Sequence, residues 1–112
     1  MREIQQTEEF REFVENAETN VKNKIDYIWD LLETQSVINS KIAKKLTNTI
    51  LYEIRIQVNN EYRILCFTID HENITQSTKI LFLNAFMKKS TKDYDKEIKK
   101  AIKILEKWND QK

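Results

Sequence analysis

The sequence predicts a small α+β domain, in which an N-terminal helical hairpin packs on an antiparallel sheet and a further helix ends the chain. Apolar residues recur at helical spacing before residue 35 and again after residue 90. Between these segments, two runs rich in β-branched and aromatic residues flank Asn59-Asn60, and residues 79–87 are almost entirely apolar. The expected order of elements is therefore β-α-α-β-β-β-α.

Composition and charge indicate one globular domain that spans residues 1–112, with 40% hydrophobic residues. No run approaches the roughly 18–20 apolar residues of a membrane span. The charged start MREIQQTEEF lacks the apolar core of a signal peptide, so we expect a cytoplasmic protein with no membrane partner. The net charge of +1 is unevenly distributed, with −5 in residues 1–35, +1 in 36–78 and +5 in 79–112. Such a basic part can bind phosphate although the total charge is near zero.

The N-terminal third is expected to form a short edge strand over residues 2–5 and then two helices. Thr7 is placed to cap a helix over residues 8–16, whose first turn carries two glutamates that favour the helix dipole. The second helix follows almost directly and has an apolar stripe of Val21, Ile25, Ile28, Leu31 and Leu32. Together they form an αα-hairpin that covers one face of the sheet.

Residues 36–46 are expected to contain a short helical turn, with Ile42 and Leu46 directed inward. Lysines would then point outward at positions 41, 44 and 45. They are either an ordinary solvated surface or the border of a surface that the following hairpin also forms.

The stretch LYEIRIQVNNEYRILCF predicts a β-hairpin, because Asn tolerates positive φ and the chain contains no Gly. A strict two-residue turn would mix polar and apolar side chains on both faces. A three-residue loop, residues 58–60, instead pairs Gln57 with Glu61 and Arg55 with Arg63. It places Tyr52, Ile54, Ile56, Tyr62, Ile64 and Cys66 on one face, so we prefer this register.

Two arginines directly opposite one another repel. Either Glu53 and Glu61 offset this repulsion as ion-pair partners, or the arginine pair is arranged to receive an anion. The planar fork of arginine is well suited to binding phosphate.

After the hairpin, residues 70–78 are expected to form a polar loop that contains the single histidine, His71. Residues 79–87 suit a central strand buried on both faces. Ser90 or Thr91 then caps the last helix, and Asp93 completes a pattern like a capping box. The apolar face of this helix is made by Ile98, Ala101, Ile102, Leu105 and Trp108.

The chain lacks the residues of several enzyme classes. With no Gly it has no glycine-rich phosphate loop, and with one His and one Cys it offers neither a catalytic triad nor a cysteine metal site. We expect no metal and no cofactor. A basic set remains, accompanied by tyrosines 52, 62 and 94. Basic side chains can stabilise charge on a phosphoryl group, and such a set can cleave RNA without a metal because the 2′-OH supplies the nucleophile.

The motifs LYEIRIQVNNEYRILCF and KILFLNAFMKKSTK, the start REI…TEEFREF and the C-terminal EIKKAIK resemble the HigB-like branch of the RelE/ParE superfamily of type II toxins. The resemblance covers nearly the whole chain. It implies a RelE-like fold and the toxin of a toxin–antitoxin pair. The activity implied is a metal-independent endonuclease that cleaves mRNA on the ribosome, and the implied partner is a helix-turn-helix antitoxin.

The same resemblance assigns site residues. The family's basic positions fall on Arg55 and Arg63 and on Lys88 or Lys89, and its C-terminal catalytic position falls nearest to Tyr94. We therefore expect Arg55, Arg63, Lys89 and Tyr94 to be catalytic, and the phosphate-binding residues to be Lys88, Lys92, Lys44 and Lys45. Two alternatives stay open, a ParE-like toxin that binds DNA gyrase without cleaving nucleic acid, and an inactive relative that binds only its antitoxin.

Overall fold

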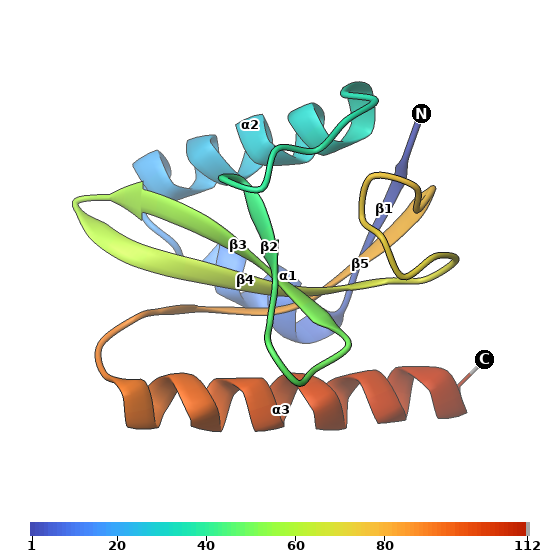
Figure 1. The fold of residues 1–112 in the computed structure, drawn as a ribbon. Coiled ribbons are helices and arrows are strands. Elements are labelled where there is room, and N and C mark those ends of the chain that lie inside the picture. Colours follow the sequence, from blue (N-terminus) through green and yellow to red (C-terminus); the bar gives the residue numbers. More distant parts are fainter. Residues whose placement is uncertain (112) are drawn as a thin grey trace.

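The computed structural model describes residues 1–111 as a five-stranded sheet between two helical layers (Figure 1). The sheet order is β1-β5-β4-β3-β2, and α2 and α3 lie on opposite sides of it. The elements are β1 (Glu3–Gln6), α1 (Glu8–Glu15), α2 (Thr19–Thr34), β2 (Ala43–Lys45), β3 (Leu51–Val58), β4 (Asn60–Thr68), β5 (Lys79–Met87) and α3 (Thr91–Asp110). The predicted α+β class and the order of the predicted elements are confirmed.

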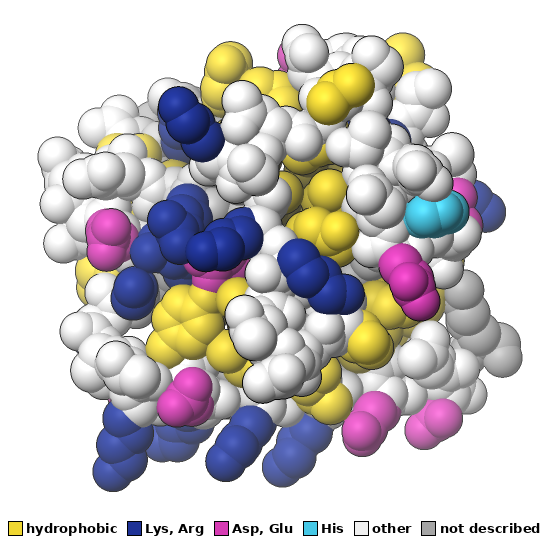
Figure 2. Space-filling model, in the orientation of Figure 1, with side chains coloured by type: hydrophobic (Ala, Val, Ile, Leu, Met, Phe, Trp, Pro, Cys, Tyr) yellow, Lys and Arg dark blue, Asp and Glu magenta, His cyan; other side chains and the backbone are white. Residues whose placement is uncertain are grey.

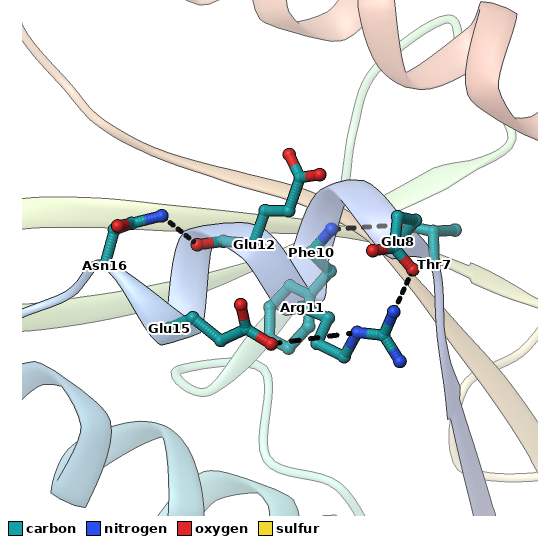
Figure 3. A network of polar contacts seen from close by, with 7 residues as sticks. All are labelled: Thr7, Glu8, Phe10, Arg11, Glu12, Glu15 and Asn16. Carbon is teal, nitrogen blue, oxygen red and sulfur yellow. Dashed lines mark hydrogen bonds and ion pairs between the residues drawn. The ribbon is translucent and has the colours of Figure 1, made fainter.

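Helix α1 begins as its sequence predicts. The Thr7 side chain accepts a hydrogen bond from Phe10 N at 3.1 Å and so caps the first turn. Along the outer face of the helix, Arg11 is ion-paired with Glu8 and lies 3.9 Å from a carboxylate oxygen of Glu15 (Figure 3). Because these charges are exposed, the pairs contribute little to stability, and packing against the sheet holds the helix in place.

Two apolar cores lie on the two faces of the sheet. On one face α1 and α2 pack on the central strands, where the rings of Phe10 and Trp29 meet Phe82 edge-on at 5.0 and 5.3 Å. On the other face α3 packs through Ala101, Ile104 and Leu105 on a set of leucines in the sheet, Leu51, Leu65, Leu81 and Leu83. Strand β5 contributes to both cores, as its uniform apolar sequence predicts.

The β3–β4 hairpin has the predicted register. Gln57 is opposite Glu61 and Arg55 is opposite Arg63. Asn59 has φ of 63°, so an asparagine takes the left-handed conformation in a chain without glycine. This register sends the isoleucines and Cys66 into the core beneath α1 and α2, and it sends both arginines to the face that α3 covers.

A β-bulge in β5 changes which side chains face α3. Leu65 is opposite Asn84 and Cys66 is opposite Phe82, so Leu83 has no partner across the strand pair. The carbonyl of Leu83 accepts a hydrogen bond from the Thr7 hydroxyl instead. Beyond the bulge Asn84 and Phe86 lie on the α3 face, whereas Ala85 packs on the opposite core.

Two predictions about the sheet are corrected. Residues 36–46 contain the expected short turn, closed by a hydrogen bond from Ala43 N to the Asn39 carbonyl at 3.2 Å, but they continue into β2, which was not predicted and which pairs with the otherwise open edge of β3. The sheet is also not wholly antiparallel. Strand β1 runs parallel to β5, with Ile4 opposite Ile80.

The 70–78 loop is organised around one carboxylate. Asp70 accepts hydrogen bonds from Ser77 Oγ at 2.6 Å, from Thr78 N at 2.9 Å and from Lys79 N at 3.1 Å. The bonds from the Ser77 and Thr78 hydroxyls are the main reason that the pKa of Asp70 lies well below its ordinary value.

We expect Asp70→Asn to lower the Tm by a few degrees at pH 7 and to flatten the acid side of the stability curve. Because the folded-state pKa is depressed, the stabilisation is complete above the unfolded pKa of about 4 and is lost as the pH falls through the folded value. Thermal unfolding between pH 2 and 7 measures this, with Asp95→Asn as the control. Parallel stability curves for Asp70→Asn and the wild type would contradict the assignment.

Candidate functional site

The predicted site residues on β3 and β4 share the face of the sheet that α3 covers. Side chains opposite one another in neighbouring strands point to the same face. Arg55 is opposite Arg63, and Arg63 is opposite Phe86 of β5. One step toward the hairpin tip, Glu61 lies beside the end of β5, where its carbonyl accepts a hydrogen bond from Lys88 N at 2.8 Å.

A single buried carboxylate joins the two arginines. Glu53 Oε1 accepts a hydrogen bond from Arg55 Nε at 2.9 Å and lies 3.5 Å from Arg63 Nε. The side chains of Glu53 and Arg63 are 4% and 5% exposed, whereas that of Arg55 is 54% exposed. The like-charged pair is therefore held together by a carboxylate between its members, and the other oxygen of that carboxylate has no hydrogen-bond partner within residues 1–111.

The two arginines are not equivalent. Arg63 is enclosed, because its Nη1 donates to the Tyr62 carbonyl at 3.1 Å and its Nη2 lies 3.9 Å from Glu61. Arg55 uses only Nε within the described chain, and its two terminal amino groups remain available. Of the two alternatives considered from the sequence, ion pairing with glutamates therefore describes Arg63. Arg55 is fixed by Glu53 and still offers hydrogen-bond donors to an anion.

Tyr94 and Lys88 lie beside this pair. The Ser90 side chain accepts from Asp93 N at 3.2 Å and starts α3, which places Tyr94 in its first turn. The Tyr94 ring meets Phe86 edge-on at 5.6 Å, and Lys88 Nζ lies 5.6 Å from the centre of the same ring. Since Phe86 is opposite Arg63, a chain of neighbouring side chains leads from Lys88 and Tyr94 through Phe86 to the arginine pair.

The remaining predicted lysines are distributed over different surfaces. Lys44 is opposite Glu53 and shares the face of the arginines. Lys45 lies on the other face, with its Nζ 5.4 Å from the centre of the Tyr52 ring, and is separated from the arginine pair by the sheet. Lys89 is exposed in the link between β5 and α3, and Lys92 is exposed in the first turn of α3.

The sheet face that carries Arg55 and Arg63 has a net positive charge near the hairpin, because four cationic side chains lie there with two carboxylates. Figure 2 shows dark-blue side chains gathered around magenta ones where β3 and β4 lie in Figure 1. The charged residues on this face near the hairpin are Lys44, Glu53, Arg55, Glu61, Arg63 and Lys88.

Tyr52 and Tyr62 belong to the opposite core. The Tyr52 hydroxyl donates to the Glu72 carbonyl and accepts from Ile74 N, each at 3.2 Å. The Tyr62 ring packs edge-on against Phe13 of α1 at 6.2 Å. Of the tyrosines considered from the sequence, Tyr94 is therefore the one that lies on the arginine face.

Two features of the site were not predicted. Glu53 was identified as a partner of the arginines but not as a buried bridge, although its position opposite Leu65 indicates an interior site. Asn84 was missed altogether, although it is a polar residue within an apolar strand. Its side-chain nitrogen donates to the Glu97 carbonyl of α3 at 3.4 Å and fixes the helix to the sheet.

His71 and Cys66 lie away from this face. His71 is exposed and accepts a hydrogen bond from Asn73 N at 2.9 Å. Cys66 is buried in the core beneath α1 and α2, and burial raises the pKa of its thiol to about 12. Within residues 1–111, no three His, Cys, Asp or Glu side chains come together as a metal site. None of the helices there is long and apolar enough to cross a bilayer.

The layered arrangement and sheet order define a RelE-like α+β protein. A crystal structure of the isolated E. coli RelE toxin is similar to this chain with a TM-score of 0.53 at 12% sequence identity, covering 89% of this chain and 98% of that one. The profile of the phage-derived Gp49-like protein family matches residues 12–106. This chain belongs to the Gp49-like family of phage-derived proteins, and its fold is RelE-like. No curated protein sequence matches the chain.

Proposed function

We propose that this protein is the toxin of a type II toxin–antitoxin pair, and that it cleaves mRNA on the ribosome without a metal ion. Its membership of the Gp49-like family and the fold that it shares with the E. coli RelE toxin support the first part. The observation that carries the second is the half-exposed guanidinium of Arg55, which Glu53 holds in place on the sheet face that also carries Lys88 and Tyr94. The HigB-like subtype and a helix-turn-helix antitoxin belong to the same proposal.

The proposed reaction uses the RNA itself as nucleophile. The 2′-OH attacks the adjacent phosphorus, the bond from phosphorus to the 5′ oxygen breaks, and the 2′ proton is transferred so that a cyclic phosphate and a 5′-OH result. Arg55, with Lys88 and Lys89, stabilises the negative charge that develops on the phosphoryl oxygens. Tyr94 assists proton transfer. Arg63 acts through Glu53 as a positioning residue, because its own guanidinium is buried.

Arg55→Ala is expected to reduce mRNA cleavage by about 10²–10³-fold, because it removes the exposed donor that stabilises the transition state. The measurement is growth after induced expression without the antitoxin, together with mapping of cleavage ends in cellular mRNA. Arg11→Ala is the matched control, because Arg11 is also 54% exposed and also ion-paired with a glutamate, but it lies on α1.

Other outcomes of this experiment identify the alternatives. Full toxicity of a folded Arg55→Ala protein would show that the site is assigned incorrectly. Growth arrest with intact mRNA and a DNA-damage response would indicate a gyrase-binding toxin of the ParE kind. No growth arrest by the wild-type protein, in hosts that express it well, would indicate an inactive relative that binds only its antitoxin.

A further inference from the structure

Helix α3 carries a continuous basic face that the site described above does not use. At 100° per residue, six lysines fall within an arc about 100° wide, and no carboxylate between residues 92 and 107 falls within it. The arc lies opposite Ala101 and Leu105, which pack on the sheet. Figure 2 shows dark-blue side chains projecting along the edge where α3 runs in Figure 1. We call this the α3 lysine face, made by Lys92, Lys96, Lys99, Lys100, Lys103 and Lys107.

The lysines of this face have no counter-charge bonded to them. Within residues 1–111, none of them takes part in an ion pair or a side-chain hydrogen bond. Several are four residues apart, as Lys96 and Lys100 are, and like charges at this spacing each destabilise a helix by about 0.2–0.5 kcal/mol. The helix therefore concentrates positive charge at some cost to its own stability.

The α3 lysine face also borders a groove. A groove of about 500 Å³ runs beside α3, where Glu9 of α1 is the single carboxylate and Ile104 the single apolar residue. The other residues that line the groove are Lys96, Lys99, Lys100, Lys103 and Lys107. A polyanion that follows the groove would meet five ammonium groups and one carboxylate.

The chemistry of the face favours a phosphodiester backbone over an acidic protein. Protein interfaces depend on aromatic and arginine anchors and are depleted in lysine. The arc contains neither kind of anchor. Lysine is a flexible point charge that contacts phosphate oxygens without requiring a fixed geometry. The face starts at Lys92 in the first turn of α3 and lies on the side of the helix opposite Tyr94, so an RNA strand held at the candidate site would pass around the start of α3 to reach it.

We propose that the α3 lysine face is a second RNA-binding surface, which holds the sugar–phosphate backbone outside the cleavage site and independently of base sequence. From Lys92 to Lys107 it is about 22 Å long at 1.5 Å per residue. This inference rests on the proposed function in that RNA is its ligand, and it adds a surface that binds RNA without taking part in the reaction.

The test is binding of a fluorescein-labelled 20-nucleotide oligouridylate to the full-length protein, followed by anisotropy at several salt concentrations. The variant Lys96→Gln/Lys99→Gln/Lys103→Gln is expected to raise Kd at least tenfold and to reduce the salt slope by about 2, since each lost phosphate contact removes about 0.7 for a single strand. The control, Lys22→Gln/Lys24→Gln/Lys41→Gln, loses the same charge from half-buried positions on α2 and from an exposed position before β2, and it should keep most of the affinity.

An unchanged Kd in the α3 variant, or an equal loss in the control, would overturn the inference. So would a face that binds polyglutamate but not oligouridylate, because that result indicates an acidic protein partner. Sedimentation with ribosomes, with and without mRNA, distinguishes ribosomal RNA from mRNA as the strand that is held. If the wild-type protein cleaves no mRNA but the α3 variant loses RNA binding, the proposed function fails and this inference stands. If the wild-type protein cleaves mRNA and the α3 variant binds RNA as tightly as the wild type, the proposed function stands and this inference fails.

Discussion

Replacing Arg2 by methionine is expected to lower the free energy of unfolding by about 3–5 kcal/mol, because it removes many buried hydrogen bonds at once. Arg2 is 7% exposed and is surrounded by backbone carbonyls, with no carboxylate among its hydrogen-bond acceptors. Burial lowers the pKa of its guanidinium, which nevertheless stays charged at neutral pH. Truncation would leave those carbonyls without a donor in a site that water reaches poorly.

The guanidinium of Arg2 connects three segments that are far apart in sequence. Its Nε donates to the carbonyls of Ile74 and Ser77 at 3.2 and 3.1 Å, and its Nη1 donates to Leu32 at 3.2 Å and to Gln35. Its Nη2 donates to Ser36 at 2.9 Å and to Thr75 at 2.6 Å. One side chain thus fixes the start of β1, the end of α2 and the loop before β5.

Chemical denaturation of Arg2→Met and Arg2→Lys measures this contribution. Lysine is expected to restore less than half of it, because an ammonium group cannot reproduce a planar fork with five donors. Arg11→Met is the matched control and should change stability by less than about 0.5 kcal/mol, since Arg11 is exposed on α1. A loss below about 1 kcal/mol for Arg2→Met would show that the carbonyls find other donors.

The parts of this fold that follow from local pattern could be predicted from the sequence. The hairpin register follows from the separation of polar and apolar side chains, because a slip of one residue would bury Arg55 and expose Ile54. Thr7 and Ser90 cap their helices as their positions indicate. These features depend on neighbours within a few residues or on one strand pair, so the sequence contains nearly all of the information.

The features that were not predicted depend on contacts between distant segments. Residues 43–45 become a strand because β3 has an open edge, and Leu83 bulges where the Thr7 hydroxyl bonds its carbonyl. In the sequence, Arg2 is simply a charged residue near the N-terminus. The role of Arg63 was ambiguous for the same reason, because its burial depends on strand β5, where Phe86 is opposite it, as well as on the hairpin.

The second large effect is expected at the carboxylate between the arginines. Glu53→Gln removes the charge that balances a buried Arg63, and loss of one partner of a buried ion pair costs about 3–5 kcal/mol. The control is Glu61→Gln, because Glu61 is 54% exposed and lies 3.9 Å from the same arginine, so its loss should cost less than about 1 kcal/mol. Urea denaturation of the purified proteins gives both values.

Replacing both buried charges separates stability from function. Glu53→Leu combined with Arg63→Met removes the pair together, and such replacements are often neutral or stabilising when the volume is kept. We expect this double variant to be within about 1 kcal/mol of the wild type and yet to lose toxicity, because Arg55 no longer has the carboxylate that fixes its Nε. Retained toxicity in the folded double variant would show that Arg55 acts without being positioned. A double variant as unstable as Glu53→Gln would show instead that the buried pair itself maintains the packing between the sheet and α3.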